Sequence, residues 1–284
     1  MDSWRTISSD GNTVILKRFS GLELKPIGPD ELAETDIKVG CAVDVETTGV
    51  DRFTDSVIEV GLQVFFFEAE SGKIVGKGES LNHLQDPGKP INELITRITG
   101  IKNSDLKNQR IDWNAVAKLI DSSHLVVAHN AFFDRSFIDR NTTYSSRPVW
   151  GCSLRQIDWV KHGCTSSGLQ MLAAFHGFFS KAHRALQDAQ MLVHLLDQDK
   201  HYVQELYQNA HAPRVIVKLN NTPYESRSLL RESGYRWSPT TKTWSQSVLK
   251  EHLKTSLSKL SDVYMGKEPQ YETIDIPLSE NFKV

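Results

Sequence analysis

Five residues that can bind a metal ion or carry a proton lie beside apolar segments of this sequence. Asp44 and Glu46 stand in A-V-D-V-E-T-T-G, Asp134 ends A-H-N-A-F-F-D, and His183 and Asp188 open and close H-R-A-L-Q-D. Side chains at positions i and i+2 leave a strand on the same face, so Asp44 and Glu46 point the same way. Two carboxylates held so close raise each other's pKa unless a cation lies between them. Oxygen-rich sites of this kind suit Mg²⁺ or Mn²⁺.

The spacing of His183 and Asp188 restricts where the histidine can lie. Five residues along one continuous helix would place them about 140° apart around the axis, given about 100° per residue. The two can converge only if His183 lies in a loop before the helix that carries Asp188. Gly177 and the following F-F-S-K-A segment are compatible with such a loop. We expect Ala185 and Ala189 to let this helix approach the sheet closely.

The three blocks resemble the DEDDh group of 3'–5' exonucleases, the DnaQ-like superfamily that includes the proofreading epsilon subunit of the bacterial replicative DNA polymerase. The family pattern is D-x-E in the first block, an Asp after H-N in the second and H-x-x-x-x-D in the third, and all three are present in order. The resemblance covers roughly residues 38–200. W-G-C-S, Q-I-D-W and S-G-Y-R-W are further similar to stand-alone bacterial exonucleases of the epsilon type.

The resemblance implies a role for each of the five residues. Asp44 would bridge two divalent ions, Mg²⁺ or Mn²⁺. Glu46 and Asp188 would complete the site of the ion that activates water, and Asp134 would hold the second ion. His183 would be the general base, because an imidazole with an ordinary pKa near 6.5 suits proton transfer at neutral pH. A histidine at this position marks the DEDDh branch, since the sister branch has tyrosine.

The resemblance also implies contacts with the terminal nucleotide. Hydroxyls, N–H groups and a glycine after the first strand could hold it, although T-G at this point is equally compatible with a simple turn. An aromatic ring, Phe132 or Phe133, could stack on a terminal base, with core packing the alternative for at least one of them. The implied substrate-binding residues are Thr47, Thr48, Gly49, His129, Asn130 and Phe133. Glu59 in S-V-I-E-V-G is interpreted as a supporting residue and not as a ligand.

Composition and periodicity divide the chain into three parts. Residues 1–37 form a leader, residues 38–209 the exonuclease domain and residues 214–284 a small C-terminal α+β module. In the middle part, three consecutive strand-like segments end near Leu84, and helical and extended patterns alternate after it. This order predicts an α/β layer with a mixed central sheet flanked by helices. That architecture is the ribonuclease-H-like fold that the resemblance implies.

Two helices are bounded by local signals. Asn92 can cap the start of one, and Gly100 can stop it. Residues 112–121, D-W-N-A-V-A-K-L-I-D, have the apolar spacing of a second amphipathic helix.

Bulk properties limit the class of protein. The chain has 284 residues and a formal net charge of −2, which argues against a binder that holds nucleic acid by bulk attraction but allows a local basic track. Cys41, Cys152 and Cys164 form no C-x-x-C pair and are odd in number, which favours packing roles in a reducing compartment. The sequence has no run of 18 apolar residues and no signal-peptide pattern in residues 1–20. We therefore expect a soluble, cytoplasmic protein.

The C-terminal module combines basic and aromatic residues. If they share a face, the module could contact nucleic acid by stacking and phosphate binding. The alternative is that the three aromatic residues form the core of a small domain and that the module packs on the exonuclease domain. The residues in question are Lys218, Arg227, Arg231, Arg236, Lys242, Lys250 and Lys254, with Tyr235, Trp237 and Trp244.

The leading functional prediction is a divalent-metal-dependent 3'–5' exonuclease acting on DNA with a free 3' end, preferably single-stranded. A second prediction keeps the chemistry and changes the substrate to RNA, as in exoribonucleases of the oligoribonuclease or RNase T kind. A third, of another class, is an inactive exonuclease fold used as a binding module in a polymerase assembly. The complete acidic set argues against the third.

Overall fold

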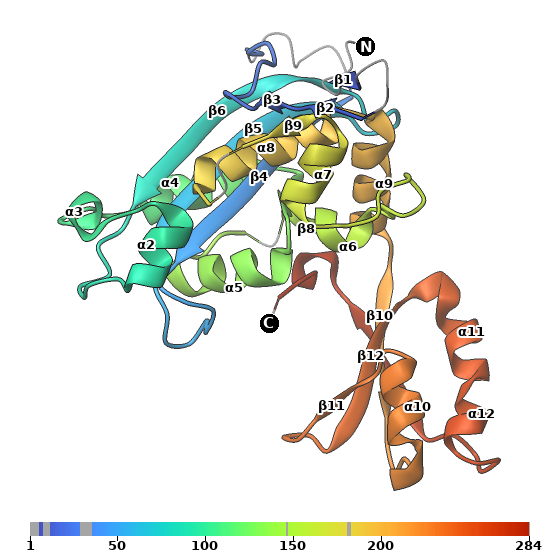
Figure 1. Cartoon of the computed structure of the whole chain (residues 1–284). Helices are drawn as coiled ribbons and strands as arrows, with labels where there is room; N and C mark the ends of the chain where they lie inside the picture. The colour runs from blue at the N-terminus through green and yellow to red at the C-terminus, as the bar shows by residue number, and fades with distance from the viewer. Residues whose placement is uncertain (1–5, 8–11, 29–35, 146, 181–182, 284) are drawn as a thin grey trace. The chain divides into compact units, whose positions relative to one another are not determined.

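The computed structural model describes residues 6–7, 12–28, 36–145, 147–180 and 183–283. The chain divides into two compact units, coloured from blue to amber and from amber to red in Figure 1. Unit 1 runs to Ala210 and takes in Phe282 and Lys283 again, whereas unit 2 comprises His211–Asn281. The predicted boundaries differ in two respects. Described residues of the leader belong to unit 1, where Phe19 is buried against Phe178, and the last residues of the predicted module also belong to unit 1.

Unit 1 is built on a five-stranded sheet of order β6-β5-β4-β7-β8. β4 pairs antiparallel with β5, and β5 pairs antiparallel with β6, whereas β7 is parallel to both β4 and β8. This mixed sheet flanked by helices confirms the predicted fold class. The strands are β4 (Ile37–Thr47), β5 (Val57–Glu68), β6 (Ile74–Leu84), β7 (Leu125–Ala128) and β8 (Val149–Cys152).

Helices and short strands cover this sheet. The helices of unit 1 are α2 (Glu93–Thr99), α3 (Asn103–Leu106), α4 (Trp113–Asp121), α5 (Ala131–Asn141), α6 (Ser153–Gln156), α7 (Leu169–Phe175), α8 (Ala185–Leu196) and α9 (Lys200–His211). The short strands are β1 (Thr6–Ile7), β2 (Val14–Ile15), β3 (Lys17–Arg18) and β9 (Phe178–Phe179). β3 pairs in parallel with β9, which attaches the N-terminal segment to the rest of unit 1.

The predicted helix boundaries agree with the structure. The Asn92 side chain accepts a hydrogen bond from the Ile95 N–H, and Gly100 has the left-handed φ of 74° that glycine adopts at helix ends. The Asp112 side chain likewise caps α4, the second predicted helix. These ends were readable from sequence because the capping contacts are local.

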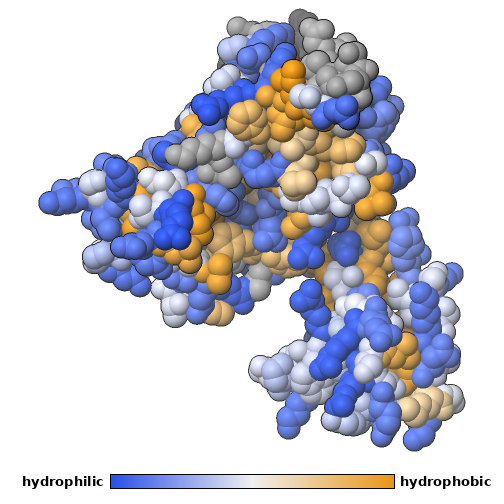
Figure 2. All heavy atoms as spheres, viewed as in Figure 1, coloured by the Kyte–Doolittle hydropathy of each residue, from blue (hydrophilic) through white to orange (hydrophobic). Residues whose placement is uncertain are grey.

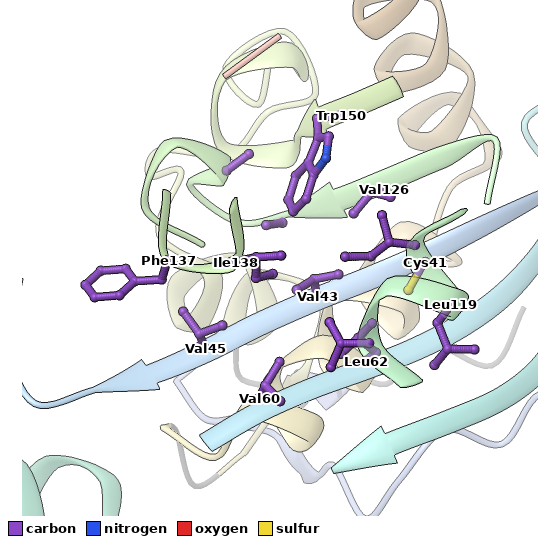
Figure 3. Close-up of a cluster of buried hydrophobic side chains, with 14 of the residues drawn as sticks. Cys41, Val43, Val45, Val60, Leu62, Leu119, Val126, Phe137, Ile138 and Trp150 are labelled. Atoms are coloured by element: carbon purple, nitrogen blue, oxygen red, sulfur yellow. The ribbon is translucent and has the colours of Figure 1, made fainter. Parts of the chain in front are cut away.

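Alternate residues of β4 point to opposite faces of the sheet. Cys41, Val43 and Val45 enter a buried apolar cluster with Leu119 of α4 and Ile138 of α5 (Figure 3). Full burial of such an aliphatic side chain contributes roughly 1.5–3 kcal/mol. This face therefore fixes the strand, and the other face is left for Asp44 and Glu46.

The opposite face of the sheet lies against α8. Gly61 of β5 is the register partner of Asp44, and a Cβ on Gly61 would lie 2.1 Å from the Leu186 nitrogen and 2.2 Å from the Ala185 carbonyl carbon. Only a glycine leaves room for the backbone of α8 at this distance. Ala185 and Ala189 are fully buried, as expected for a helix that approaches the sheet closely.

Unit 2 is an α+β fold with a four-stranded antiparallel sheet of order β11-β12-β10-β13. The chain order of its strands and helices is β-α-β-β-α-β, the split βαβ arrangement. Leu230, Leu260 and Val263 from the helices pack with Val217 and Trp244 of the sheet in one buried cluster. Its elements are β10 (Arg214–Leu219), α10 (Arg227–Glu232), β11 (Arg236–Ser238), β12 (Thr243–Leu249), α11 (Leu253–Ser258), α12 (Leu260–Val263) and β13 (Tyr271–Ile276).

Two further sequence-based expectations concern cysteines and membranes. Cys41, Cys152 and Cys164 are all buried and free, in agreement with packing roles. Among the described residues, the helices include none whose length and apolar character would let it span a bilayer.

Gly61→Ala is expected to destabilise unit 1, because the new methyl group must displace the first turn of α8. Overpacking of this kind costs about 1–3 kcal/mol. Urea unfolding of the variant should therefore show a reduced free energy of unfolding. Gly28→Ala is the control, since nothing lies within 4 Å of the Cβ that it adds. Equal stability of the two variants would contradict the close contact between α8 and β5.

Candidate active site

The four predicted acidic ligands come from three elements that meet at one site: β4 and the first turns of two helices. Asp44 and Glu46 lie on β4, whereas Asp134 and Asp188 lie in the first turns of α5 and α8. The Val45 N–H, between the two β4 carboxylates, donates a hydrogen bond of 3.1 Å to Asp134 Oδ1. The backbone of β4 therefore holds Asp134 in place, which brings α5 to the same site.

His183 precedes the helix that carries Asp188. α8 begins at Ala185, and His183 has a left-handed φ of 67°, which is rare for a residue other than glycine. The His183 N–H donates to Asp188 Oδ2 at 2.7 Å. The expected loop position of His183 is confirmed, although residues 181–182 of the predicted loop lie outside the described residues.

Three of the five predicted residues form one compact group. One ligand atom each from Glu46, His183 and Asp188 lies within 4.8 Å of the other two. Asp44 and Asp134 fall outside this group, but they remain close enough for their charges to act on each other. The structure therefore brings all five residues to one region. Glu46, His183 and Asp188 form the compact group, and Asp44 and Asp134 lie near it.

Burial raises the pKa of all four carboxyl groups above the ordinary range. The pKa of Glu46 rises to about 8 and that of Asp134 to about 7. The pKa of Asp188 is also raised, and that of Asp44 is raised well above its usual value by burial and then by the charges of Asp134, Asp188 and Glu46. The site therefore favours protons or a cation over four free negative charges.

The site suits a divalent cation for a second reason. Asp188 Oδ1 is buried and has no hydrogen-bond partner among the described residues, although such an atom ordinarily has one. Its neighbours within the group are another carboxylate and an imidazole. A donor set rich in carboxylate oxygen fits Mg²⁺ or Mn²⁺. The residues that could hold the ions are Asp44, Glu46, Asp134 and Asp188.

An ion pair between the buried Glu59 and the partly exposed Arg184 supports the start of α8. Glu59 has 0% exposure and lies directly opposite Glu46 in the β4–β5 register. Its carboxylate accepts from Arg184 Nη2 at 2.8 Å and from the Ala185 N–H at 3.0 Å. Glu59 thus satisfies a free N–H in the first turn of α8 from the neighbouring strand.

The part played by Arg184 was missed in the sequence. A signal existed, because a carboxylate in a buried strand needs a positive or N–H partner. The sequence alone does not say which of several arginines supplies it. The interpretation of Glu59 as a supporting residue agrees with its contacts.

The hydroxyl groups at the end of β4 and in the following loop form hydrogen bonds within that loop. Thr47 Oγ1 donates to the Gly49 carbonyl, and Thr48 Oγ1 donates to Asp55 Oδ1 at 2.9 Å. A Cβ on Gly49 would lie 2.4 Å from Asp55 Oδ2, so the glycine is needed for this turn. These contacts favour the turn interpretation of Thr48 and Gly49, and their role in substrate binding stays a prediction.

His129 and Asn130 connect β7 to α5. His129 Nδ1 lies 2.9 Å from Ser153 Oγ, and burial lowers the pKa of His129 to about 4. Asn130 has a left-handed φ of 95° immediately before α5. Both residues lie a few positions before Asp134, and their contact with a substrate stays a prediction.

The two phenylalanines at the start of α5 differ in exposure. Phe133 lies 5.0 Å from Phe137 between ring centroids and packs against the apolar cluster. Phe132 is 42% exposed and contacts the ring of Phe282 and the guanidinium of Arg155. The packing alternative therefore describes Phe133, and Phe132 is the better candidate for stacking on a base.

Comparison with protein families assigns the chain to a class. The family model described as Exonuclease (RNase T) matches residues 41–196, and the matched segment contains all five candidate residues. Because this segment is more than half of the chain, the chain belongs to this exonuclease family. The predicted resemblance to the DnaQ-like superfamily, and the prediction of an exonuclease, are thereby confirmed.

Individual relatives match only part of the chain. DNA polymerase III PolC-type of Caldanaerobacter subterraneus subsp. tengcongensis is 30% identical over 152 residues, which are 51% of this chain and 10% of the polymerase. The PolC-type polymerase of Listeria welshimeri is 36% identical over 109 residues, 37% of this chain and 7% of its own length. The chain thus spans a tenth or less of these relatives. A solved structure of exonuclease X in complex with 5' overhanging duplex DNA is 20% identical, with a TM-score of 0.41 over 61% of this chain and 92% of that one.

Arg184→Ala is expected to destabilise unit 1 by about 1–3 kcal/mol, because it leaves the buried Glu59 carboxylate without its cation, although solvent at the partly exposed arginine reduces the loss. Adding Glu59→Gln to this variant should restore part of the loss, since the glutamine carries no charge. Thermal unfolding of the two single variants and the double variant measures the coupling between the residues. Additive losses would show that the pair makes no specific contribution.

Stability without metal is expected to fall as the pH rises. The pKa of each site carboxyl is higher in the folded than in the unfolded chain, so the site stabilises the fold below the unfolded-state pKa of Glu46, about 4.5. That contribution is lost as the pH rises through the folded-state pKa of Glu46, about 8. Melting temperatures measured in chelator should fall across this window, and Mg²⁺ or Mn²⁺ should raise them more near the upper end.

The matched variant for this experiment is Asp44→Asn, which removes one of the repelling charges. Its melting temperature should fall less with pH and rise less with metal. Asp262→Asn, at an exposed position of α12, is the control and should behave like the unchanged chain. If the metal raised the melting temperature equally at both ends of this pH window, protons and metal ions would not be competing for the carboxylates.

Proposed function

We propose that this protein is a divalent-metal-dependent 3'–5' exonuclease that acts on single-stranded DNA and releases nucleoside 5'-monophosphates. The observation that carries the proposal is that ligand atoms of Glu46, His183 and Asp188 lie within 4.8 Å of one another, beside Asp188 Oδ1, which has no hydrogen-bond partner in the described part of the chain. An acidic group with raised pKa values and a histidine at its edge is the arrangement that metal-assisted hydrolysis needs.

Each residue has a distinct part in the proposed site. Asp44 and Asp134 would hold one ion, and Glu46 and Asp188 would hold an ion near His183, with Asp44 contributing to both. The chemistry that bound divalent ions supply is activation of water and neutralisation of charge on the leaving oxygen. His183 is exposed, and its backbone is tied to Asp188, so its imidazole can accept the proton of the attacking water.

The identity of the substrate rests on the relatives. The matched proteins are named as DNA polymerases, and the matched segment is a small part of each, which favours a DNA strand with a free 3' end. Phe132, exposed at the start of α5, is positioned two residues before Asp134 and can stack on a terminal base.

Asp44→Asn is expected to lower the rate of hydrolysis at least about 10³-fold while the fold persists, because no other carboxylate can replace one shared by two metal positions. The assay uses purified protein with Mg²⁺ or Mn²⁺ on single-stranded DNA and RNA labelled at either end. Asp197→Asn, at the C-terminal end of α8, is the matched control and should retain full activity.

Direction and substrate follow from the same assay. Label at the 3' end should leave first as a mononucleotide, a 3' phosphate should slow the reaction, and circular single strands should resist it. Undiminished cleavage by folded Asp44→Asn protein, or in excess chelator, would refute the metal mechanism. Faster cleavage of RNA than of DNA would replace the proposed substrate with RNA.

A further inference from the structure

Five basic residues of unit 2 fall into two groups with different partners. Lys218 Nζ lies 3.5 Å from a carboxylate oxygen of Glu272, and Lys250 Nζ lies 2.8 Å from Asp275 Oδ1. Both acidic residues belong to β13, so this side of the sheet is largely neutral. On the other side, no ion pair with an acidic residue of the described chain is found for Arg227, Arg231 and Arg236.

The arginines of α10 lie over aromatic rings. Arg227 and Arg231 are four residues apart and therefore share one face of the helix. The guanidinium carbon of Arg227 lies 4.1 Å from the ring centroid of Tyr224, which is 72% exposed. The guanidinium carbon of Arg231 lies 5.8 Å from the ring of Trp244. Their charges therefore remain available at the surface, although stacking restricts their positions.

An exposed tryptophan lies at the edge of the same surface. Trp237 of β11 pairs with Trp244 of β12, with ring centroids 5.6 Å apart, and is 46% exposed. β11 is the outermost strand on this side of the sheet. Trp237 shares the helix-covered face with Trp244, so its neighbour Arg236 points to the other face and is not part of this surface. Tyr235 and Trp244 are buried in the core of unit 2, so the alternative of core packing applies to them and not to Trp237.

We propose that this surface, the β11 edge, binds single-stranded DNA through the phosphates and one or two bases. The β11 edge consists of Tyr224, Arg227, Arg231 and Trp237. One guanidinium group can donate two parallel hydrogen bonds to two oxygens of a phosphate, and exposed aromatic rings stack on bases of any sequence. The inference rests on the proposed function only for the identity of the strand as DNA.

A strand of nucleic acid fits the β11 edge better than an apolar partner does. The surface of unit 2 visible in Figure 2 is mostly hydrophilic, whereas a protein interface of useful size needs a continuous apolar centre. Arginines that have no acidic partner in the described part of the chain lie beside flat rings here, so they supply charge and stacking together, which is the combination that single strands require.

The test is binding of the full chain to a fluorescent oligothymidylate of about 20 nucleotides, measured by anisotropy in chelator at several salt concentrations. Arg227→Ala/Arg231→Ala should reduce the slope of log affinity against log salt by roughly 1.4, at about 0.7 for each phosphate on a single strand. Trp237→Ala should weaken binding about 5- to 150-fold. Lys218→Ala/Lys250→Ala is the matched control: it removes two charges that are already paired, and it should change the slope less.

Point variants are preferred to removal of unit 2, which would also remove the contact of Phe282 with Phe132. Unchanged binding by the double arginine variant, an equal effect of the lysine control, or no binding by the unchanged chain would overturn the inference. Tighter binding of oligouridylate would overturn the assignment to DNA. Release of mononucleotides from a trinucleotide should persist in every variant; its absence from the unchanged chain would refute the proposed nuclease and leave the β11 edge to be judged on binding alone.

Discussion

The close contact of α8 with β5 is the constraint on which the candidate site depends. Gly61 lets the backbone of the first turn reach the strand, and this turn carries Asp188 directly beside the acidic face of β4. Any larger residue in place of Gly61 would move α8 and with it Asp188. The apolar cluster on the opposite face of the sheet holds β4 and β5 in register, so the two sides of the sheet have separate tasks.

The acidic residues around this contact differ in whether their carboxylate oxygens have partners. Glu59 is fully compensated by Arg184 and by a backbone N–H, and it stabilises the start of α8. Asp188 keeps one buried oxygen that has no partner among the residues that the structure describes, and Glu46 shares its surroundings with like charges. An uncompensated buried carboxyl costs stability unless it is protonated or binds a cation. The same strand pair therefore contains one satisfied carboxylate that supports the fold and others that remain available to a ligand.

Much of the fold and of the site was predictable because the signals are local or have a fixed period. Asn92 and Gly100 mark helix ends through contacts within a few residues, and the helical period required His183 to lie before α8. The pairing of Glu59 with Arg184 was not predictable, because it depends on strand register and on where a distant loop arrives. Likewise, the sequence placed aromatic and basic residues together in the C-terminal segment, but only the sheet order separates the buried Trp244 from the exposed Trp237.

Because Phe282 belongs to unit 1 again, unit 2 lies between two segments of unit 1: it is joined covalently to Ala210, and the segment after it is held by the packing of Phe282. The entropy cost of closing such a loop grows only slowly with its length, by about 0.6 kcal/mol for each doubling. Extra residues within unit 2 would therefore weaken the docking of Phe282 on Phe132 very little. A backbone cut next to Phe282 would leave the covalent link at Ala210 intact, whereas a cut at Ala210 would leave only non-covalent contacts such as that of Phe282 with Phe132.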